Sequence, residues 1–168
     1  MAGGSGRKQG DGPAHTITND GWEYTIQQNL TSLFYSNRAA IQQFIAQKSG
    51  GAILNISSVL GFSPSRHFFA THAYAAAKSA LESMANTMAI ELGPLGISVN
   101  VVTPAFTLTD ASLVMPEAFR ERVKDTRPLK KHLYPEDVAG AIAFLAGAEA
   151  SMLTGSHILI TGGSHLQL

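Results

Sequence analysis

Short apolar runs alternate with longer helical patterns along this chain, and that alternation limits the fold more than any other feature of the sequence. The apolar runs are continuous and rich in Ile, Leu and Val, as expected for strands that are buried on both faces. They occupy residues 52–57, 97–103 and 157–160. Helices that separate such strands pack on both faces of a parallel sheet. We therefore predict an α/β fold in three layers, with about three parallel strands and flanking helices.

The first long helical pattern starts near Thr18 or Asn19, where short polar side chains can cap a helix, and extends to about Gln47. Its apolar residues recur at spacings of three and four, which predicts a stripe that faces the core. The stripe consists of Trp22, Ile26, Leu30, Leu33, Phe34, Ile41, Phe44 and Ile45. Asn29 lies beside this stripe, and a lone Asn in a helix is usually exposed or bonded to a nearby backbone carbonyl.

A second helical pattern, at residues 74–92, contains the pair Tyr74 and Lys78. Residues four apart in a helix lie on one face, so the phenol and the ammonium are within reach of each other. A nearby positive charge favours the phenolate, which would let the phenol exchange protons near neutral pH. Ser58, at the end of a predicted strand, can offer a hydrogen bond to the same substrate oxygen. The alternative is that Tyr74 and Lys78 only decorate a solvated helix face.

Residues 1–16 are rich in glycine and predict a flexible loop. Glycine backbones and basic side chains suit anions, and residues 4–8 contain both. No strand precedes this run, however, and its spacing fits neither a P-loop nor a dinucleotide-binding turn. The whole chain, residues 1–168, is predicted to form a single domain, and this loop is its first part.

The charge of the chain excludes some classes of partner. Twelve basic and twelve acidic residues cancel, and like charges do not cluster, so charge gives no reason to expect nucleic acid or an anionic membrane as a partner. No stretch approaches the roughly twenty apolar residues of a membrane span. The chain has no cysteine and therefore no thiolate ligands, and we expect no metal site. A soluble, cytoplasmic protein is the default prediction.

The order of these features resembles the short-chain dehydrogenase/reductase family, in which a Ser precedes a Tyr-x-x-x-Lys helix. Further matches follow the family's order, and the resemblance extends from Ala2 to the C-terminus. The further matches include Asn29-Leu30-Thr31, Pro104-Ala105, Pro135-Glu136-Asp137 and Gly162-Gly163. The resemblance implies a Rossmann-like domain that is incomplete here, because the family's first half, with its glycine-rich turn, is absent from this sequence.

The resemblance also implies roles for four residues. Tyr74 would exchange the proton with the substrate, and Lys78 would lower the pKa of the tyrosine and bind the ribose of the cofactor. Ser58 would steady the substrate oxygen. Asn29 would hold a water molecule in a proton relay to Lys78.

A nicotinamide cofactor, NAD or NADP, is implied in the same way. Besides Tyr74 and Lys78, two segments would contact it. Ala2 and Gly3 stand where the family's Asn-Asn-Ala-Gly segment ends. The second segment resembles Pro-Gly-x-x-x-Thr, whose backbone and Thr hydroxyl hold the nicotinamide carboxamide, and it contributes Pro104, Ala105, Thr107 and Thr109. Ala105 replaces the usual glycine.

Two loops would then line the substrate pocket. The fifteen residues between Ser58 and Tyr74 include His67 and His72, which are expected to be solvated, although either can act as an extra acid or base. Residues 110–133, with a short helix near 116–124, would cover the substrate, since such loops carry specificity and move.

Two functions of different class remain open. The first is an NAD(P)(H)-dependent oxidoreductase that interconverts a small-molecule alcohol and a carbonyl. The second is a truncated, inactive remnant that acts only as an association module or scaffold. In either case the resemblance implies a homo-oligomer, because the family uses the two helices that carry Asn29 and Tyr74 as a dimer interface.

Overall fold

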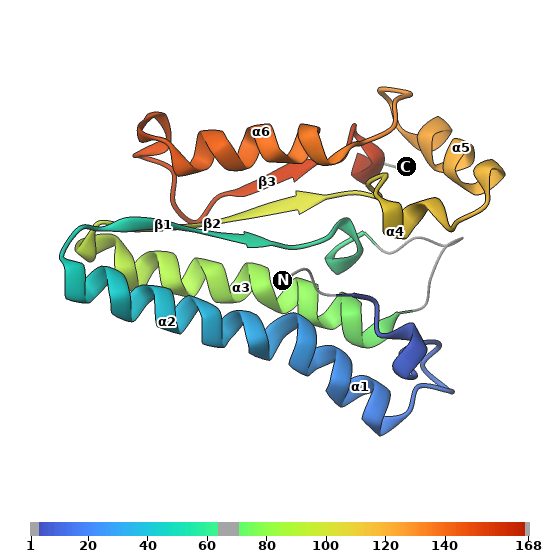
Figure 1. The fold of residues 1–168 in the computed structure, drawn as a ribbon, viewed down its shortest axis with the longest axis horizontal. Helices are drawn as coiled ribbons and strands as arrows, with labels where there is room; N and C mark the ends of the chain where they lie inside the picture. Colours follow the sequence, from blue (N-terminus) through green and yellow to red (C-terminus); the bar gives the residue numbers. More distant parts are fainter. Residues whose placement is uncertain (1–3, 64–70, 167–168) are drawn as a thin grey trace.

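The computed structural model describes residues 4–63 and 71–166, and these form a parallel sheet between two groups of helices (Figure 1). The sheet consists of β1 (Gly51–Ile56), β2 (Ile97–Pro104) and β3 (His157–Ile160), in that spatial order. Both pairings are parallel, with Gly51 opposite Ile97 and Val101 opposite His157. The predicted α/β class and the three strands are confirmed. Within the described residues β1 pairs only with β2, so its other side is an open edge.

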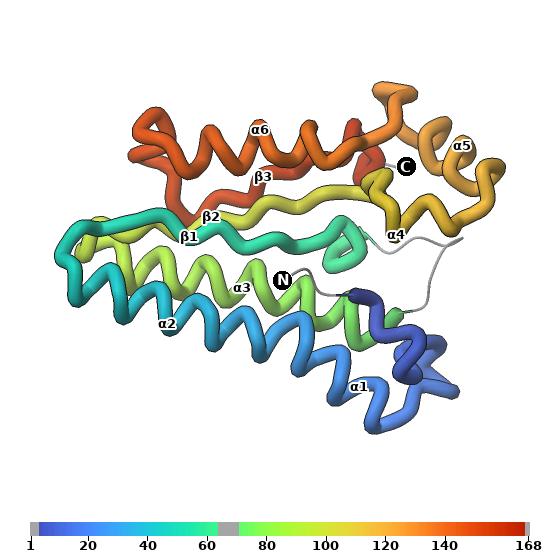
Figure 2. The backbone as a smooth tube through the Cα atoms, in the orientation of Figure 1, coloured from blue at the N-terminus to red at the C-terminus, as the bar shows by residue number. Residues whose placement is uncertain are grey.

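The helices cover the two faces of the sheet unequally (Figure 1). One face carries α1 (Asn19–Ile26), α2 (Ser32–Gln47) and α3 (His72–Leu92), and the other carries α6 (Pro135–Ala146). The short helices α4 (Asp110–Leu113) and α5 (Glu117–Thr126) lie beyond the ends of the strands, as the tube in Figure 2 also shows. No helix in the described part of the chain is long and apolar enough to cross a bilayer.

Alternation along β2 builds a separate core on each face of the sheet. Val99 and Val101 pack with α3, whereas Val102 packs with α6. The first core also contains Ile53, Ala85, Met88, Ala89, Leu92 and Ile97, and the second contains Leu145 and Ala150. Because side chains alternate along a strand, a valine-rich strand between two helical layers buries both of its faces.

The helix predicted from residue 19 to residue 47 forms, but a π-helical turn divides it. The Thr18 hydroxyl accepts a hydrogen bond from the Gly21 N–H at 3.0 Å and so caps α1. The π turn η2 (Gln27–Thr31) separates α1 from α2 and contains Asn29, whose side chain is fully buried. A π turn holds more residues than an α turn, so it can redirect a side chain that an α-helix would leave beside the apolar stripe.

The prediction that the whole apolar stripe of this helix faces the core is wrong. Trp22, Phe34 and Ile45 are 43%, 40% and 49% exposed, whereas Ile41 and Phe44 pack against the core. The helix lies against β1, which is the edge strand, and no further layer covers the rest of the stripe within the described residues.

Residues 4–16 form a loop with one 3-10 turn, in which Gly6 and Asp11 are buried while residues 13–16 are exposed. A single 3-10 turn, η1 (Arg7–Gln9), lies between Gly6 and Gly10, both of which have left-handed backbone conformations. A Cβ at Gly6 would lie 1.8 Å from the Thr25 Oγ1, and a Cβ at Gly21 would lie 2.5 Å from the Gly10 carbonyl carbon. The glycines therefore let this segment approach α1 more closely than residues with side chains would allow.

Candidate active site

Ser58, Tyr74 and Lys78 meet where β1 ends and α3 begins. The Ser58 hydroxyl hydrogen-bonds to the Tyr74 phenol, and it also accepts a hydrogen bond from the Leu60 N–H at 3.3 Å. The Lys78 Nζ lies 5.6 Å from the centroid of the Tyr74 ring, as their helical spacing predicts. The structure thus brings together three of the four side chains that the sequence singled out as catalytic.

Burial dominates the proton affinity of Tyr74. Removal of the phenolate from water raises the pKa of the Tyr74 phenol, and the hydrogen bond from Ser58 lowers it by less. This differs from the lowered pKa expected from the nearby Lys78. The Lys78 Nζ instead donates to the Ile56 carbonyl at 2.8 Å.

Lys78 itself is buried, with only 5% of its surface exposed. Burial disfavours the ammonium and lowers the pKa of Lys78 to about 8. Its backbone is held as well, because the Ser57 hydroxyl donates to the Lys78 carbonyl at 2.9 Å. Lys78 can therefore gain or lose a proton only about one pH unit above neutrality.

The low pKa of Lys78 makes the folding stability depend on pH. Between its folded-state pKa of about 8 and its unfolded value of about 10.4, the unfolded chain binds more protons, so stability rises with pH. We expect the free energy of unfolding to increase by about 2 kcal/mol from pH 8 to pH 10. Urea unfolding at several pH values measures this, and Lys78→Met should flatten the profile. An equally steep rise in the Met variant would contradict the assignment.

Asn29, the fourth predicted catalytic residue, makes its hydrogen bonds to other parts of the chain. Its Nδ2 donates to the Gly4 carbonyl and to the Thr25 carbonyl, both at 2.9 Å. Its Oδ1 is buried without a partner among the described atoms. Its hydrogen bonds therefore leave a free acceptor, and none of them goes to Ser58, Tyr74 or Lys78.

Asp11 holds the start of α3, a contact that no pattern in the sequence indicates. Its carboxylate accepts hydrogen bonds from the Ala73 N–H at 3.2 Å and from the Tyr74 N–H at 3.1 Å. Next to it, the His72 Nδ1 lies 2.9 Å from the Gly12 carbonyl. His72 is therefore the first residue of α3 and has a backbone partner, not a free loop histidine. His67 lies outside the described residues.

Gly61 lets the turn that follows Ser58 touch the backbone of α3. A Cβ at this position would lie 2.9 Å from the Ser79 nitrogen and 3.1 Å from the Lys78 carbonyl carbon. Both are backbone atoms within a helix and cannot move aside singly. The close approach fixes the distance between the turn η3 (Val59–Gly61) and the helix that carries Tyr74 and Lys78.

We expect Gly61→Ala to lower the free energy of unfolding by about 1 to 3 kcal/mol, because the added methyl group pushes the turn away from α3. Gly140→Ala is the matched control. Gly140 lies within α6 with no atom near its missing Cβ, so alanine there should stabilise the helix by about 0.5 to 1 kcal/mol. Thermal unfolding of both variants measures the difference, and equal effects at the two glycines would contradict the close contact.

The predicted cofactor segment follows β2. The Ala105 N–H donates to the Ile160 carbonyl at 3.0 Å, and the Thr107 hydroxyl donates to the Ala105 carbonyl at 3.0 Å. Pro104 ends β2, and Thr109 is the N-cap residue of α4, where its N–H donates to the Ser112 hydroxyl at 2.7 Å. The Thr107 hydroxyl thus supports the local backbone, and the Thr109 backbone is held by α4. Ala2 and Gly3, the other predicted cofactor contacts, lie outside the described residues.

Arg127 supports this segment through hydrogen bonds to two backbone carbonyl groups. Its guanidinium donates to the Phe106 carbonyl and, at 2.9 Å, to the Lys131 carbonyl. Arg127 is only 2% exposed, and burial lowers the pKa of its guanidinium. A Cβ on Gly162 would lie 3.3 Å from the Arg127 Cδ. One buried side chain therefore joins the loop after β2, the loop after α5 and the end of β3.

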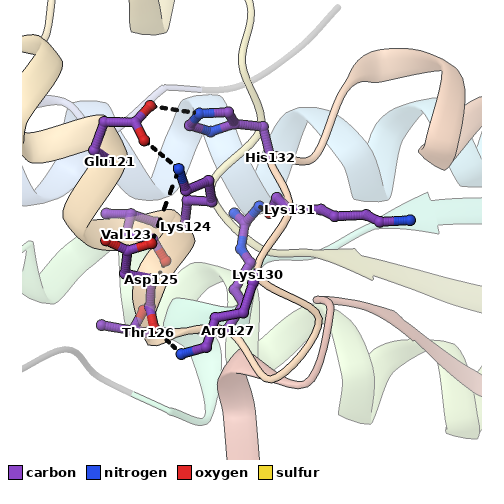
Figure 3. A network of polar contacts seen from close by, with 9 residues as sticks. All are labelled: Glu121, Val123, Lys124, Asp125, Thr126, Arg127, Lys130, Lys131 and His132. Carbon is purple, nitrogen blue, oxygen red and sulfur yellow. Dashed lines mark hydrogen bonds and ion pairs between the residues drawn. The ribbon is translucent and has the colours of Figure 1, made fainter.

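The segment predicted to cover a substrate has an internal polar network, which Figure 3 shows. Glu121 in α5 bonds to Lys124 and to the His132 Nε2, the latter at 2.9 Å. These two hydrogen bonds, with Lys124 first, lower the pKa of Glu121. The network holds α5 to the loop that follows it. Within the described residues no cluster of His, Asp or Glu has the arrangement of a metal site.

The chain is similar to known oxidoreductases over almost its whole length. A family model described as enoyl-(acyl carrier protein) reductase matches residues 1–165. The chain is 37% identical over 147 residues to the 3-oxoacyl-acyl-carrier-protein reductase of Rickettsia conorii, which covers 88% of this chain and 59% of that protein. It is 34% identical over 147 residues to the (3R)-3-hydroxyacyl-CoA dehydrogenase of Mus musculus, with coverages of 88% and 56%.

Solved structures agree with these relatives. A 4-hydroxyisoleucine dehydrogenase mutant, complexed with NADH and succinate, superposes with a TM-score of 0.88 at 27% identity. The match covers 99% of this chain and 67% of the other. The chain thus spans less than two thirds of the length of the curated relatives that it matches.

Proposed function

The chain belongs to the short-chain dehydrogenase/reductase family, and from this premise we propose that it carries the catalytic half of an NAD(P)(H)-dependent oxidoreductase that interconverts an alcohol and a carbonyl. One observation carries the proposal: the Ser58 hydroxyl meets the phenol of Tyr74, with the Lys78 ammonium 5.6 Å from the same ring. A partly buried acid beside a hydrogen-bond donor and a cation is an arrangement suited to proton transfer.

In the direction of reduction, the Tyr74 O–H bond breaks and the proton moves to the carbonyl oxygen. The nicotinamide, when bound, supplies the hydride for the carbonyl carbon. Ser58 holds the carbonyl oxygen through its hydroxyl. The phenolate that remains is stabilised by the charged form of Lys78 and regains a proton through a relay, in which the free Oδ1 of Asn29 offers an acceptor for water.

The residues present fit one end of the cofactor. Backbone groups of Pro104, Ala105 and Thr107 stand at the carboxyl end of β2, where ligands of parallel sheets bind. The methyl group of Ala105 slightly reduces the space between the backbone at this position and a bound cofactor. The glycine-rich turn that would hold the pyrophosphate has no counterpart in this sequence. We therefore propose that these residues hold the nicotinamide end, with NAD or NADP equally compatible.

The relatives support a small-molecule substrate. Those named above act on 3-oxoacyl, 3-hydroxyacyl and 4-hydroxyisoleucine compounds, all of which contain an alcohol or a carbonyl. We propose the same chemical class here, without a choice among them, and a cytoplasmic location.

A second candidate function, as an association module, is favoured by the outer surface of the helices. An apolar depression of 490 Å³ lies between residues of η2, α2 and α3. It is lined by Leu30, Thr31, Phe34, Ala80, Ser83, Met84 and Thr87. We propose that this surface pairs with a second copy of the chain. Such pairing is compatible with catalysis and would also persist in an inactive chain.

Calorimetric titration of the purified chain with NADH and with NADPH tests the proposal. Saturable binding of either nucleotide supports the oxidoreductase, and a preference between the two would identify the cofactor. A folded sample that binds neither, yet sediments as a dimer, would favour the association module.

A further inference from the structure

We propose that Asp11 is a positioning residue for Tyr74: its buried carboxylate holds the first turn of α3 by two backbone N–H groups and so fixes where the phenol lies. This inference rests on the proposed function, because a fixed phenol matters for proton transfer to a substrate.

The geometry of Asp11 is that of a helix cap supplied from far along the chain. One carboxylate oxygen meets the Ala73 N–H at 3.2 Å and the other meets the Tyr74 N–H at 3.1 Å, across 62 and 63 residues of sequence. Thr71, at the N-cap position of α3, makes no side-chain cap of its own. A negative charge is favourable at a helix N-terminus, and hydrogen bonds to an ionised carboxylate are stronger than neutral ones.

Asp11 is in turn fixed by its own segment. It is only 4% exposed, and its N–H donates to the Gly6 carbonyl at 3.1 Å. Gly6 packs closely on Thr25 in α1. The segment that carries Asp11 is therefore held by α1, while the Asp11 carboxylate holds the start of α3.

The same segment also contacts the second predicted catalytic element. The Gly4 carbonyl accepts the hydrogen bond from Asn29 Nδ2 at 2.9 Å, seven residues before Asp11 meets Tyr74. Residues 4–11 thus join the π turn that carries Asn29 to the first turn of the helix that carries Tyr74. This segment can set the distance between Asn29 and Tyr74 without any of its own side chains reaching the substrate.

The test compares Asp11→Ala and Asp11→Asn with Asp137→Ala. Asp137 also caps a helix, since its Oδ2 accepts the Tyr134 N–H at 2.8 Å at the start of α6. Two readouts need no turnover: hydrogen exchange of the Ala73 and Tyr74 amides, and the phenol titration of Tyr74, isolated by subtracting a Tyr74→Phe chain.

We expect Asp11→Ala to speed exchange of the Ala73 and Tyr74 amides at least about ten-fold, because loss of charge-assisted hydrogen bonds frees the first turn. The pKa of the Tyr74 phenol should fall toward its ordinary value as burial is lost. Asp11→Asn should move both readouts less, because its amide oxygen still accepts one hydrogen bond. Asp137→Ala should lower stability without moving either readout.

The inference is overturned if the amide exchange rates and the pKa of the Tyr74 phenol are the same in the Asp11→Ala chain as in the Asp137→Ala chain. Should the Ala variant fail to fold, Asp11→Asn decides in the same way. Failure of the proposed function looks different: the unaltered chain would bind neither NADH nor NADPH, while the Tyr74 readouts still responded to Asp11.

Discussion

Tyr74→Phe is expected to reduce the rate of carbonyl reduction by about 10² to 10⁴, because it removes the O–H that supplies the proton and leaves the ring in place. Phe keeps the partly buried ring of residue 74 in its place, so the thermal unfolding midpoint should hardly change. The rate is measured as NAD(P)H oxidation with a 3-oxoacyl thioester, the substrate type named for one of the relatives.

Tyr24→Phe is the matched control for this prediction. Tyr24 is 44% exposed on α1, and the hydrogen bonds and ring contacts of Ser58 and Lys78 within the described residues do not include it. The same loss of one hydroxyl there should leave the rate unchanged. Full activity of the Tyr74→Phe chain would remove Tyr74 from the mechanism.

Arg127→Ala is expected to lower the free energy of unfolding by about 3 to 5 kcal/mol, since it leaves two partly buried carbonyl groups without donors and leaves a cavity where the buried side chain was. The carbonyls of Phe106 and Lys131 lose their partner at once. Urea unfolding measures the change, and calorimetry with NADH tests whether the displaced loop also weakens nucleotide binding.

Two further variants make this second prediction specific. Arg127→Lys keeps a positive charge but cannot donate to both carbonyls in the same fork geometry, so only a small part of the loss should be recovered. Arg38→Ala removes an exposed guanidinium that lies over the rings of Phe34 and Tyr35, and should cost about 0.5 to 1 kcal/mol. A loss at Arg127 no larger than the loss at Arg38 would show that the buried fork contributes little.

The parts of the fold and site that follow from local periodicity could be predicted from the sequence. Val99, Val101 and Val102 alternate between two cores because a strand has a period of two. Tyr74 and Lys78 share a face because a helix brings residues four apart together. Such patterns need no knowledge of the rest of the chain.

The parts that failed depend on contacts between distant segments. Asp11 is one acid in a glycine-rich stretch, and only the folded chain brings it to Tyr74 across 63 residues. Arg127 has no pattern that marks it as buried, since its partners are backbone carbonyls of loops. The exposure of Trp22 depends on how many layers of the fold cover α1. The spacing of apolar residues along the helix does not indicate that number.

The open side of β1 is an edge at which the sheet can grow. Among the described residues no strand occupies the peptide groups on that side, so a neighbouring parallel strand can pair there without breaking any bond between β1 and β2. A strand from a second polypeptide can therefore add to the sheet at this edge.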